Sequence, residues 1–296
     1  MTVPEPARLR WHEDPEAFRD LLTLTAARTG FRVVLVEKDY YGSVLLEYLA
    51  AGCPAMIFKG GTCLSKVHTD FHRMSEDLDF AIPVSAGSTR SERSRLADEL
   101  KRAMAGLERR LPGLRTVTPL RGANNSTQYL AAVAYTAQIG RQEETIKIEA
   151  GLREPLLEPA IRGEARTLLL GPVSDSPLVP AVFLPCMSYN EAMAEKLRAA
   201  LSRRDPAIRD FYDVDHAVYR RGFPVRDAAF LALVRRKLDV PGNPVVDRSA
   251  GRAAALRLQV ETALAPVLRP VDLEGFDLDR ALAIVAAVAD AVESTR

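Results

Sequence analysis

The sequence predicts an α+β fold. Two segments with apolar residues at helical spacing, 15–30 and 34–52, come first, and each ends at a glycine. Residues 88–113 place six apolar side chains on one stripe, which indicates an amphipathic helix that Pro112 and Gly113 end. Runs with strand-like composition follow at 115–120, 127–139, 144–152 and 165–173. A helix beside several strands is typical of an α+β core.

Two short strands are expected between these helices. Residues 55–61, "AMIFKGG", are apolar and end in two glycines, and residues 77–82, "DLDFAI", are closed by Pro83. The order of elements is therefore two helices, two short strands, a long helix and a group of strands.

The best candidate for a domain boundary is the proline-rich stretch from Gly171 to Pro185, because its four prolines prevent a regular helix. Beyond it, Ser188 and Glu191 form a capping box that opens one helix, and further amphipathic helices follow. We therefore expect three parts: a helical lead packed on the core (1–52), the core (53–180) and a helical C-terminal lobe (181–296).

Composition restricts the class of protein. Forty Lys and Arg against 39 Asp and Glu give a net charge of +1, so any contact with nucleic acid must come from a local patch. Three cysteines without CxxC spacing argue against a disulfide or zinc framework. The N-terminal residues lack the apolar core of a signal peptide, and no apolar run is long enough to span a membrane. We expect a soluble cytoplasmic protein.

The second strand carries two acids. On a strand, Asp77 and Asp79 point to the same side, about 7 Å apart, while Leu78 and Phe80 point into the core. Like charges this close favour a bound cation, and Mg²⁺ commonly takes one or two carboxylates together with substrate phosphates. Upstream, Gly60 and Gly61 let backbone amides approach a phosphate, and the Thr62 hydroxyl adds a donor.

A third acid is expected from a neighbouring strand. Glu149 lies between Ile148 and Ala150 in "TIKIEAG", so it faces away from the core. Three acids that hold two metal ions can steady the attacking and leaving oxygens of a nucleotidyl transfer. Glu149 could also accept the proton of the attacking hydroxyl.

This pattern resembles the polymerase-β-like nucleotidyltransferase superfamily, whose core is a mixed sheet with flanking helices. More narrowly, the chain resembles the AbiEii/MenT nucleotidyltransferase toxins of bacterial toxin–antitoxin systems. The motifs that carry this resemblance follow one another over residues 36–213: "VEKDYY", "FKGGT", "SEDLDF", "IKIEAGLRE", "AEKLRA" and "RDFYD". The interval between Thr62 and Asp77 is slightly longer than is usual in the superfamily.

The resemblance implies an enzyme that uses a nucleoside triphosphate and Mg²⁺, with the 3′ end of tRNA as acceptor in the MenT group. Lys196 matches the family's phosphate-facing lysine, and Asp210 matches an acid needed for activity. Ser75 matches a serine that some partner proteins modify to silence the enzyme. A cognate antitoxin, encoded by a neighbouring gene, is the expected partner. We expect the nucleotide to bind in the groove between core and lobe.

Each of these residues also has a purely structural interpretation. An Asp-x-Asp pair can belong to a solvated edge strand, and Glu149 can pair with Lys147 or Arg153. Lys196 can be a surface lysine, and Asp210 can pair with nearby arginines. His68 and His72 have helical i,i+4 spacing, but without a third ligand we expect them to face solvent or an acceptor.

The acceptor is open as well. Transfer to a hydroxyl of a protein or a small molecule remains an alternative, as does a module that binds RNA or a partner without catalysis. The sequence does not say which nucleotide or tRNA is used, or how many subunits assemble.

Overall fold

The computed structural model describes residues 10–85, 87–173 and 175–294, so the first nine residues of the predicted helical lead lie outside it. The chain forms two compact units. The sheet unit comprises the described residues of Met1–Asp70, Met74–Arg153 and Arg162–Cys186, and the helical unit those of Phe71–Arg73, Glu154–Ile161 and Met187–Arg296. The predicted α+β fold with a helical C-terminal region is confirmed.

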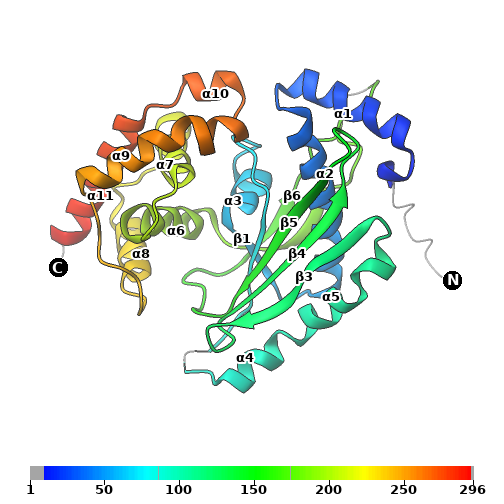
Figure 1. The fold of residues 1–296 in the computed structure, drawn as a ribbon. Helices are drawn as coiled ribbons and strands as arrows, with labels where there is room; N and C mark the ends of the chain where they lie inside the picture. The colour runs from blue at the N-terminus through cyan, green and yellow to red at the C-terminus, as the bar shows by residue number, and fades with distance from the viewer. Residues whose placement is uncertain (1–9, 86, 174, 295–296) are drawn as a thin grey trace. The chain divides into compact units, whose positions relative to one another are not determined.

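A mixed seven-stranded sheet forms the centre of the sheet unit, in the order β3-β4-β5-β2-β1-β7-β6 (Figure 1). β2 runs parallel to β5 and antiparallel to β1, β1 runs parallel to β7, and β3, β4 and β5 form an antiparallel meander. The strands span Ile57–Lys59 (β1), Leu78–Ala81 (β2), Leu114–Ala123 (β3), Gln128–Thr136 (β4), Glu143–Gly151 (β5), Ile161–Ala165 (β6) and Val182–Cys186 (β7).

One face of this sheet, the inner face, is covered by helices. Tyr41 of α2 (Val33–Gly52) stacks on Tyr135 of β4 with ring centroids 3.9 Å apart. The register places Tyr135 on the same face as the buried apolar side chains of β5 and β2. α5 (Asp98–Arg110) packs on α2 through the Tyr48 hydroxyl, which donates to the Ala103 carbonyl at 2.7 Å. The opposite, outer face carries the polar residues of the same strands.

The two predicted N-terminal helices are present as α1 (Pro15–Thr29) and α2. Asp14 caps α1 by accepting from the Ala17 amide, and Gly30 ends it in the left-handed conformation. Phe18 of α1 contacts Tyr40 of α2, with ring centroids 4.6 Å apart. The aromatic pair holds the helical lead within the sheet unit.

Three consecutive charged residues of α2 each bind a different part of the sheet unit. Glu37 accepts from the amides of Gln138 and Ile139 in the β4–β5 turn, at 2.6 and 3.1 Å. Lys38 pairs with Glu76, just ahead of β2, at 2.5 Å. Asp39 pairs with the buried Lys66 at 2.5 Å. The "VEKDYY" motif therefore joins α2 to the β4–β5 turn, to the segment ahead of β2 and to the turn Leu64–His68.

The predicted helix over 88–113 is two helices, α4 (Arg90–Leu96) and α5. They meet at Ala97, whose ψ of 3° is not helical. α4 begins with a complete capping box, Thr89 with Glu92, but buries no side chain. α5 buries four residues of the predicted stripe, whereas Leu96 of α4 is 44% exposed. No core contact holds α4 in line with α5, so the expected single helix was wrong.

One strand prediction also needs correction. The strand expected at 165–173 lies earlier, as β6, and meets that range only at Ala165. β7 begins inside the proline-rich stretch and ends one residue after it, at Cys186, which is paired with Phe58 of β1. Prolines exclude a helix but still permit this short extended segment. The predicted boundary after residue 180 therefore precedes a strand of the sheet.

Helices make up most of the helical unit. Glu191 of α6 (Tyr189–Ser202) is fully buried, and its backbone amide donates to the Ser188 hydroxyl. The Glu191 carboxylate accepts from the amides of Leu157 and Glu158. The buried Lys237 lies 2.7 Å from the same carboxylate. The elements are α6 (Tyr189–Ser202), α7 (Ile208–Asp215), α8 (Ala228–Leu238), α9 (Ala250–Gln259), α10 (Pro270–Glu274) and α11 (Leu278–Ser294), with π-helical or 3₁₀ turns at His216–Arg220, Val260–Leu264 and Ala265–Val267.

Within the described ranges, no helix is both long and apolar enough to cross a membrane. Cys53, Cys63 and Cys186 are buried, and none of them forms a disulfide.

Candidate functional site

Two of the three predicted acids lie side by side on the outer face of the sheet. Asp79 of β2 and Glu149 of β5 are directly aligned on neighbouring parallel strands, which places their Cα atoms about 5 Å apart. Both side chains are partly exposed, while Leu78, Phe80 and Ile148 beside them are buried. The parallel pairing therefore unites two carboxylates that are 70 positions apart in the sequence.

Asp77 lies one residue before β2, which begins at Leu78. Its backbone carbonyl accepts a hydrogen bond from the Thr62 hydroxyl. A hydroxyl has one proton to donate, so in this arrangement Thr62 fastens the segment ahead of β2. This differs from the expectation that Thr62 donates to a phosphate.

Gly60 lies directly against the acid pair. Its φ is +76°, and a Cβ at this position would lie 2.2 Å from Oδ2 of Asp79 and 2.8 Å from its Cγ. Only glycine fits, because any side chain would displace the carboxylate and would strain the backbone. Gly61 and Thr62 are buried in the short helix α3 (Gly60–Cys63) that follows.

Lys59 was not singled out from the sequence. It is the last residue of β1 and is aligned with Asp79 on the neighbouring antiparallel strand. Aligned residues share a face, so a lysine lies next to the acid pair on the outer face. Its position immediately before the glycine pair was the only available signal, and the register was needed to interpret it.

The donor set at this site suits magnesium. Asp79 and Glu149 offer carboxylate oxygens on a partly exposed face, and the missing Cβ of Gly60 lets the Asp79 carboxylate lie directly against the backbone. Mg²⁺ is usually bound by one or two carboxylates and completes its shell with water and substrate phosphates. Among the described residues, no three or more His, Cys, Asp or Glu side chains gather into a group that could hold a metal ion. The pair therefore matches a site that substrate completes.

Residues that precede β2 in sequence are fastened inside the helical unit. Arg73 binds Asp213 of α7 through two parallel hydrogen bonds, at 2.6 and 2.7 Å, and both side chains are buried. His72 Nε2 lies 2.8 Å from the same carboxylate, and its backbone carbonyl accepts from the Tyr212 hydroxyl at 3.0 Å. We call Arg73 and Asp213 the clamp. The chain continues from it through Ser75, which is partly exposed, to Asp77 and Asp79.

Lys196 and Asp210 lie next to the clamp. The Lys196 ammonium is 2.9 Å from both Asp210 and Asp213, and Arg203 lies 3.5 Å from Asp210. Burial alone would lower the pKa of Lys196, but the two carboxylates outweigh it and raise the pKa. Burial would raise the pKa of Asp213, but Arg73 and Lys196 hold it well below its usual range. Lys196 is therefore a fixed ammonium ion within a network, rather than a free surface lysine.

Comparison with known proteins assigns the chain to a family. Residues 44–285 match the family described as the nucleotidyl transferase AbiEii toxin of type IV toxin–antitoxin systems. The chain belongs to this family. The match includes the glycine pair, the acid pair and the clamp. The AbiEii assignment makes the chain a nucleotidyltransferase, a class of enzyme that uses nucleoside triphosphates.

The solved structure of MenT4 supports the same fold. MenT4, a nucleotidyltransferase toxin from Mycobacterium tuberculosis, is 20% identical to this AbiEii-family chain, with 94% of this chain and 99% of MenT4 covered and a TM-score of 0.56. JHP933 from Helicobacter pylori is 16% identical, with 88% and 93% covered and a TM-score of 0.49. Comparison with curated protein sequences gave no match.

The histidine prediction was wrong for His72. It is buried against Asp213 and is not on a helix, because Asp70 and Phe71 adopt left-handed conformations after the π-helical turn Leu64–His68. His72 also lies close to His216, with ring centroids 4.7 Å apart. Burial lowers the pKa of His72, and it lowers that of His216 to about 3. Both rings are neutral at pH 7.

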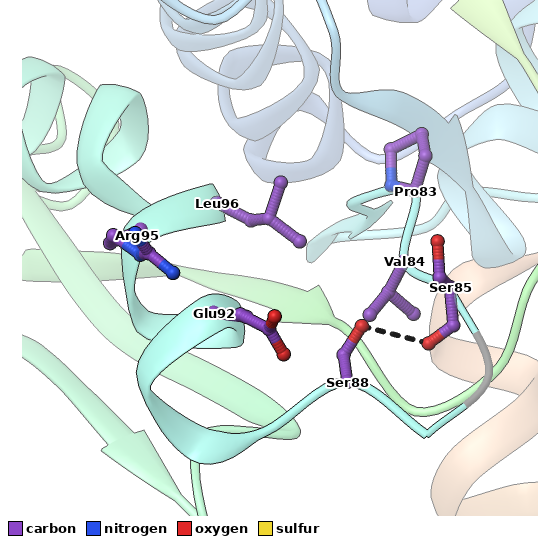
Figure 2. Close-up of a pocket in the computed structure, with 7 residues that line it drawn as sticks. All are labelled: Pro83, Val84, Ser85, Ser88, Glu92, Arg95 and Leu96. Carbon is purple, nitrogen blue, oxygen red and sulfur yellow. Dashed lines mark hydrogen bonds between the residues drawn. The ribbon is translucent and has the colours of Figure 1, made fainter.

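A cavity of about 640 Å³ lies beyond the end of β2 and contains none of the predicted site residues. Figure 2 shows Glu92, Arg95 and Leu96 of α4 on one side and the chain after β2 on the other. The Ser88 hydroxyl donates to the Ser85 carbonyl, and Glu92 is engaged in the capping box. The Ser88 hydroxyl and the Glu92 carboxylate of this cavity thus stabilise the local structure.

Proposed function

We propose that this AbiEii-family enzyme transfers a nucleoside monophosphate from a nucleoside triphosphate to the 3′ end of tRNA, with Mg²⁺ bound by Asp79, Glu149 and Asp77. The alignment of Asp79 with Glu149 beside Gly60 is the observation that carries the proposal. Two aligned carboxylates on a partly exposed face raise the cost of each other's ionisation, which nearby positive charge offsets; Lys59 lies beside Asp79, and a bound Mg²⁺ would add to it. The tRNA acceptor rests on the resemblance to the MenT group.

The proposed reaction is an in-line displacement at the α-phosphorus. The acceptor hydroxyl oxygen forms a bond to phosphorus, the bond to the β-phosphate oxygen breaks, and pyrophosphate leaves. Magnesium, when bound, would neutralise negative charge on the phosphates. Glu149 accepts the hydroxyl proton, and Gln128, which donates to Glu149 Oε1 at 2.8 Å, fixes its orientation. Gly60 lets the Asp79 carboxylate lie directly against the backbone, and Gly61 contributes to the nucleotide-binding segment.

Lys196 and Asp210 are proposed to serve the same reaction, because both match motif positions of the family. Their mutual ion pair at 2.9 Å holds the ammonium in one orientation, which suits a group that recognises phosphate. A tRNA that carries an extra nucleotide at its 3′ end cannot be aminoacylated, so translation and growth would stop.

Silencing by the antitoxin is proposed to act at Ser75. This partly exposed serine lies two residues before Asp77, in the segment that Lys38 fastens through Glu76. A phosphate at Ser75 would add negative charge next to the acids, repel the triphosphate and compete for the metal.

The central test is nucleotide transfer. Purified protein is incubated with each α-³²P-labelled nucleoside triphosphate, Mg²⁺ and a tRNA pool, and the label is followed on denaturing gels. We expect one nucleotide to label tRNA, Asp79→Asn to lose at least a hundredfold in rate, and Asp98→Asn on α5 to keep its activity. Full labelling by Asp79→Asn would refute the mechanism.

The acceptor is tested with whole-cell extract in place of tRNA. Label that resists protease and is removed by nuclease supports RNA, whereas label that only protease removes would make the acceptor a protein. Label in neither RNA nor protein would indicate a small molecule as the acceptor. If toxicity in cells survives Asp79→Asn, the protein acts by binding and not by catalysis.

The Ser75 proposal is tested by mass spectrometry after co-expression with the product of the neighbouring gene. We expect inactive protein to contain a phosphopeptide that covers Ser75. Inactive protein with this peptide unmodified would refute the proposal.

A further inference from the structure

The registers of four strands define one transverse row on the outer face. Arg121 of β3 is aligned with Leu130 of β4, Leu130 with Glu149, and Glu149 with Asp79. Neighbouring strands are about 4.8 Å apart, so Leu130 lies roughly 5 Å and Arg121 roughly 10 Å from Glu149, measured between Cα atoms. The acid pair therefore continues directly into an open stretch of sheet.

The side chains of this stretch are exposed. Leu130 is 40% exposed, although it lies in the middle strand of an antiparallel meander. Arg121 is exposed, and so is Lys147, which lies two residues before Glu149 on the same face of β5. We call Arg121, Leu130 and Lys147 the acceptor face.

Neither cation of the acceptor face forms an ion pair with a described residue. Arg115, on the same face, is paired with Glu143 at 2.5 Å. Arg121 and Lys147, in contrast, make no ion pair or side-chain hydrogen bond with any of the residues that the structure describes. Arg121 and Lys147 are two strand spacings and two residues apart, which corresponds to roughly 12 Å between their Cα atoms. They present two unneutralised charges on either side of Leu130.

We infer that the acceptor face binds the phosphate backbone and one base of the RNA acceptor, next to the acid pair. Arg121 and Lys147 contact phosphates, and Leu130 provides apolar surface for an unpaired base. The net charge of the chain is only +1, so attraction of a polyanion must come from such a local arrangement. Phosphate contacts position a nucleic acid without reading its sequence, which places a 3′ hydroxyl beside Glu149. This inference rests on the proposed nucleotide transfer to RNA.

The test measures RNA binding separately from catalysis. The full-length protein is titrated into a fluorescein-labelled tRNA pool in buffer with EDTA and without nucleotide, and anisotropy is recorded between 50 and 300 mM salt. The variants are Arg121→Glu, Lys147→Glu and Leu130→Ser. Arg109→Glu is the matched control, because Arg109 is also exposed but lies on α5, over the inner face.

Each lost phosphate contact should weaken binding about fourfold to fivefold near 0.15 M salt and should lower the salt slope by roughly 0.7 to 0.9. We expect both charge variants to show at least this loss. Leu130→Ser should weaken binding with an unchanged slope, because an apolar contact releases no counterions. Arg109→Glu should bind as the parent protein does. Unchanged affinity and slope in both Arg121→Glu and Lys147→Glu, or an equal loss in Arg109→Glu, would overturn the inference.

Transfer assays separate this inference from the proposed function. If the parent protein labels tRNA and both charge variants keep the KM of the parent for tRNA, the acceptor face is wrong and the proposed reaction stands. If the parent protein labels no acceptor but the charge variants lose RNA affinity, the face is supported and the proposed reaction fails. A higher KM for tRNA at unchanged kcat supports both.

Discussion

Asp213→Asn should destabilise the helical unit by about 3–5 kcal/mol, because it removes one partner from a buried group of charges. The Asp213 carboxylate accepts from Arg73 at 2.6 and 2.7 Å, lies 2.8 Å from His72, and lies 2.9 Å from Lys196. Asparagine keeps the shape of aspartate but removes its charge. The two buried cations, Arg73 and Lys196, then have Asp210 as their main counter-charge. Their uncompensated burial is the source of the loss.

Urea denaturation followed by two probes measures the effect. The only tryptophan, Trp11, belongs to the sheet unit, so its fluorescence reports that unit, while far-UV circular dichroism reports both. We expect Asp213→Asn to lower the midpoint of the dichroism transition much more than that of the fluorescence transition. Arg73→Met should cost less than Asp213→Asn, because Asp213 then keeps Lys196 and His72. Arg73→Met combined with Asp213→Leu should recover part of the loss.

The pH dependence provides a second check on the clamp. The pKa of Asp213 is held well below its value in the unfolded chain, so its contribution is present above about pH 4. That contribution is lost only as pH falls through the lower pKa of the folded state. The difference in unfolding free energy between the parent protein and Asp213→Asn should therefore stay constant from pH 8 to pH 5. The assignment of a buried, ionised Asp213 would be refuted if Asp213→Asn lowered the unfolding free energy by less than 1 kcal/mol at pH 7. It would also be refuted if the difference in unfolding free energy between the two proteins vanished by pH 5.

Three further outcomes are expected. Gly60→Ala should cost about 1–3 kcal/mol of stability from backbone strain and should abolish nucleotide transfer by displacing Asp79, and an active, fully stable variant would contradict the close approach. His216 takes up a proton in the unfolded chain below pH 6.5 but in the folded protein only near pH 3, so its contribution should lower stability as pH falls, by ~1 kcal/mol at pH 5 once its partial exposure is considered. His216→Phe should therefore reduce the change of the urea midpoint between pH 6.5 and pH 5. A midpoint that changes with pH as much as in the parent protein would count against this. Lys237→Met should cost ~3–5 kcal/mol by leaving Glu191 buried without a cation, and Glu191→Gln in the same chain should restore part of it in dichroism melts.

The local pattern determined most of the elements. Helical spacing with Gly30 and Gly52 as stops predicted the first two helices, and alternation around Asp79 and Glu149 predicted which side of each strand is polar. These features depend on neighbours within a few residues, so they can be read along the chain. The helix over 88–113 was misjudged because apolar spacing does not show whether a segment has a surface to pack against.

The sequence by itself determined the type of chemistry: a glycine pair, acids on strand faces and a set of family motifs. Only the tertiary structure decided which groups meet. The parallel pairing of β2 with β5 aligned Asp79 with Glu149, and the pairing of β1 with β2 placed Lys59 beside them. The fold also joined Arg73 to Asp213, 140 residues later. Such partners are fixed by strand register and by the burial of charge, and both depend on segments that are far apart in the chain.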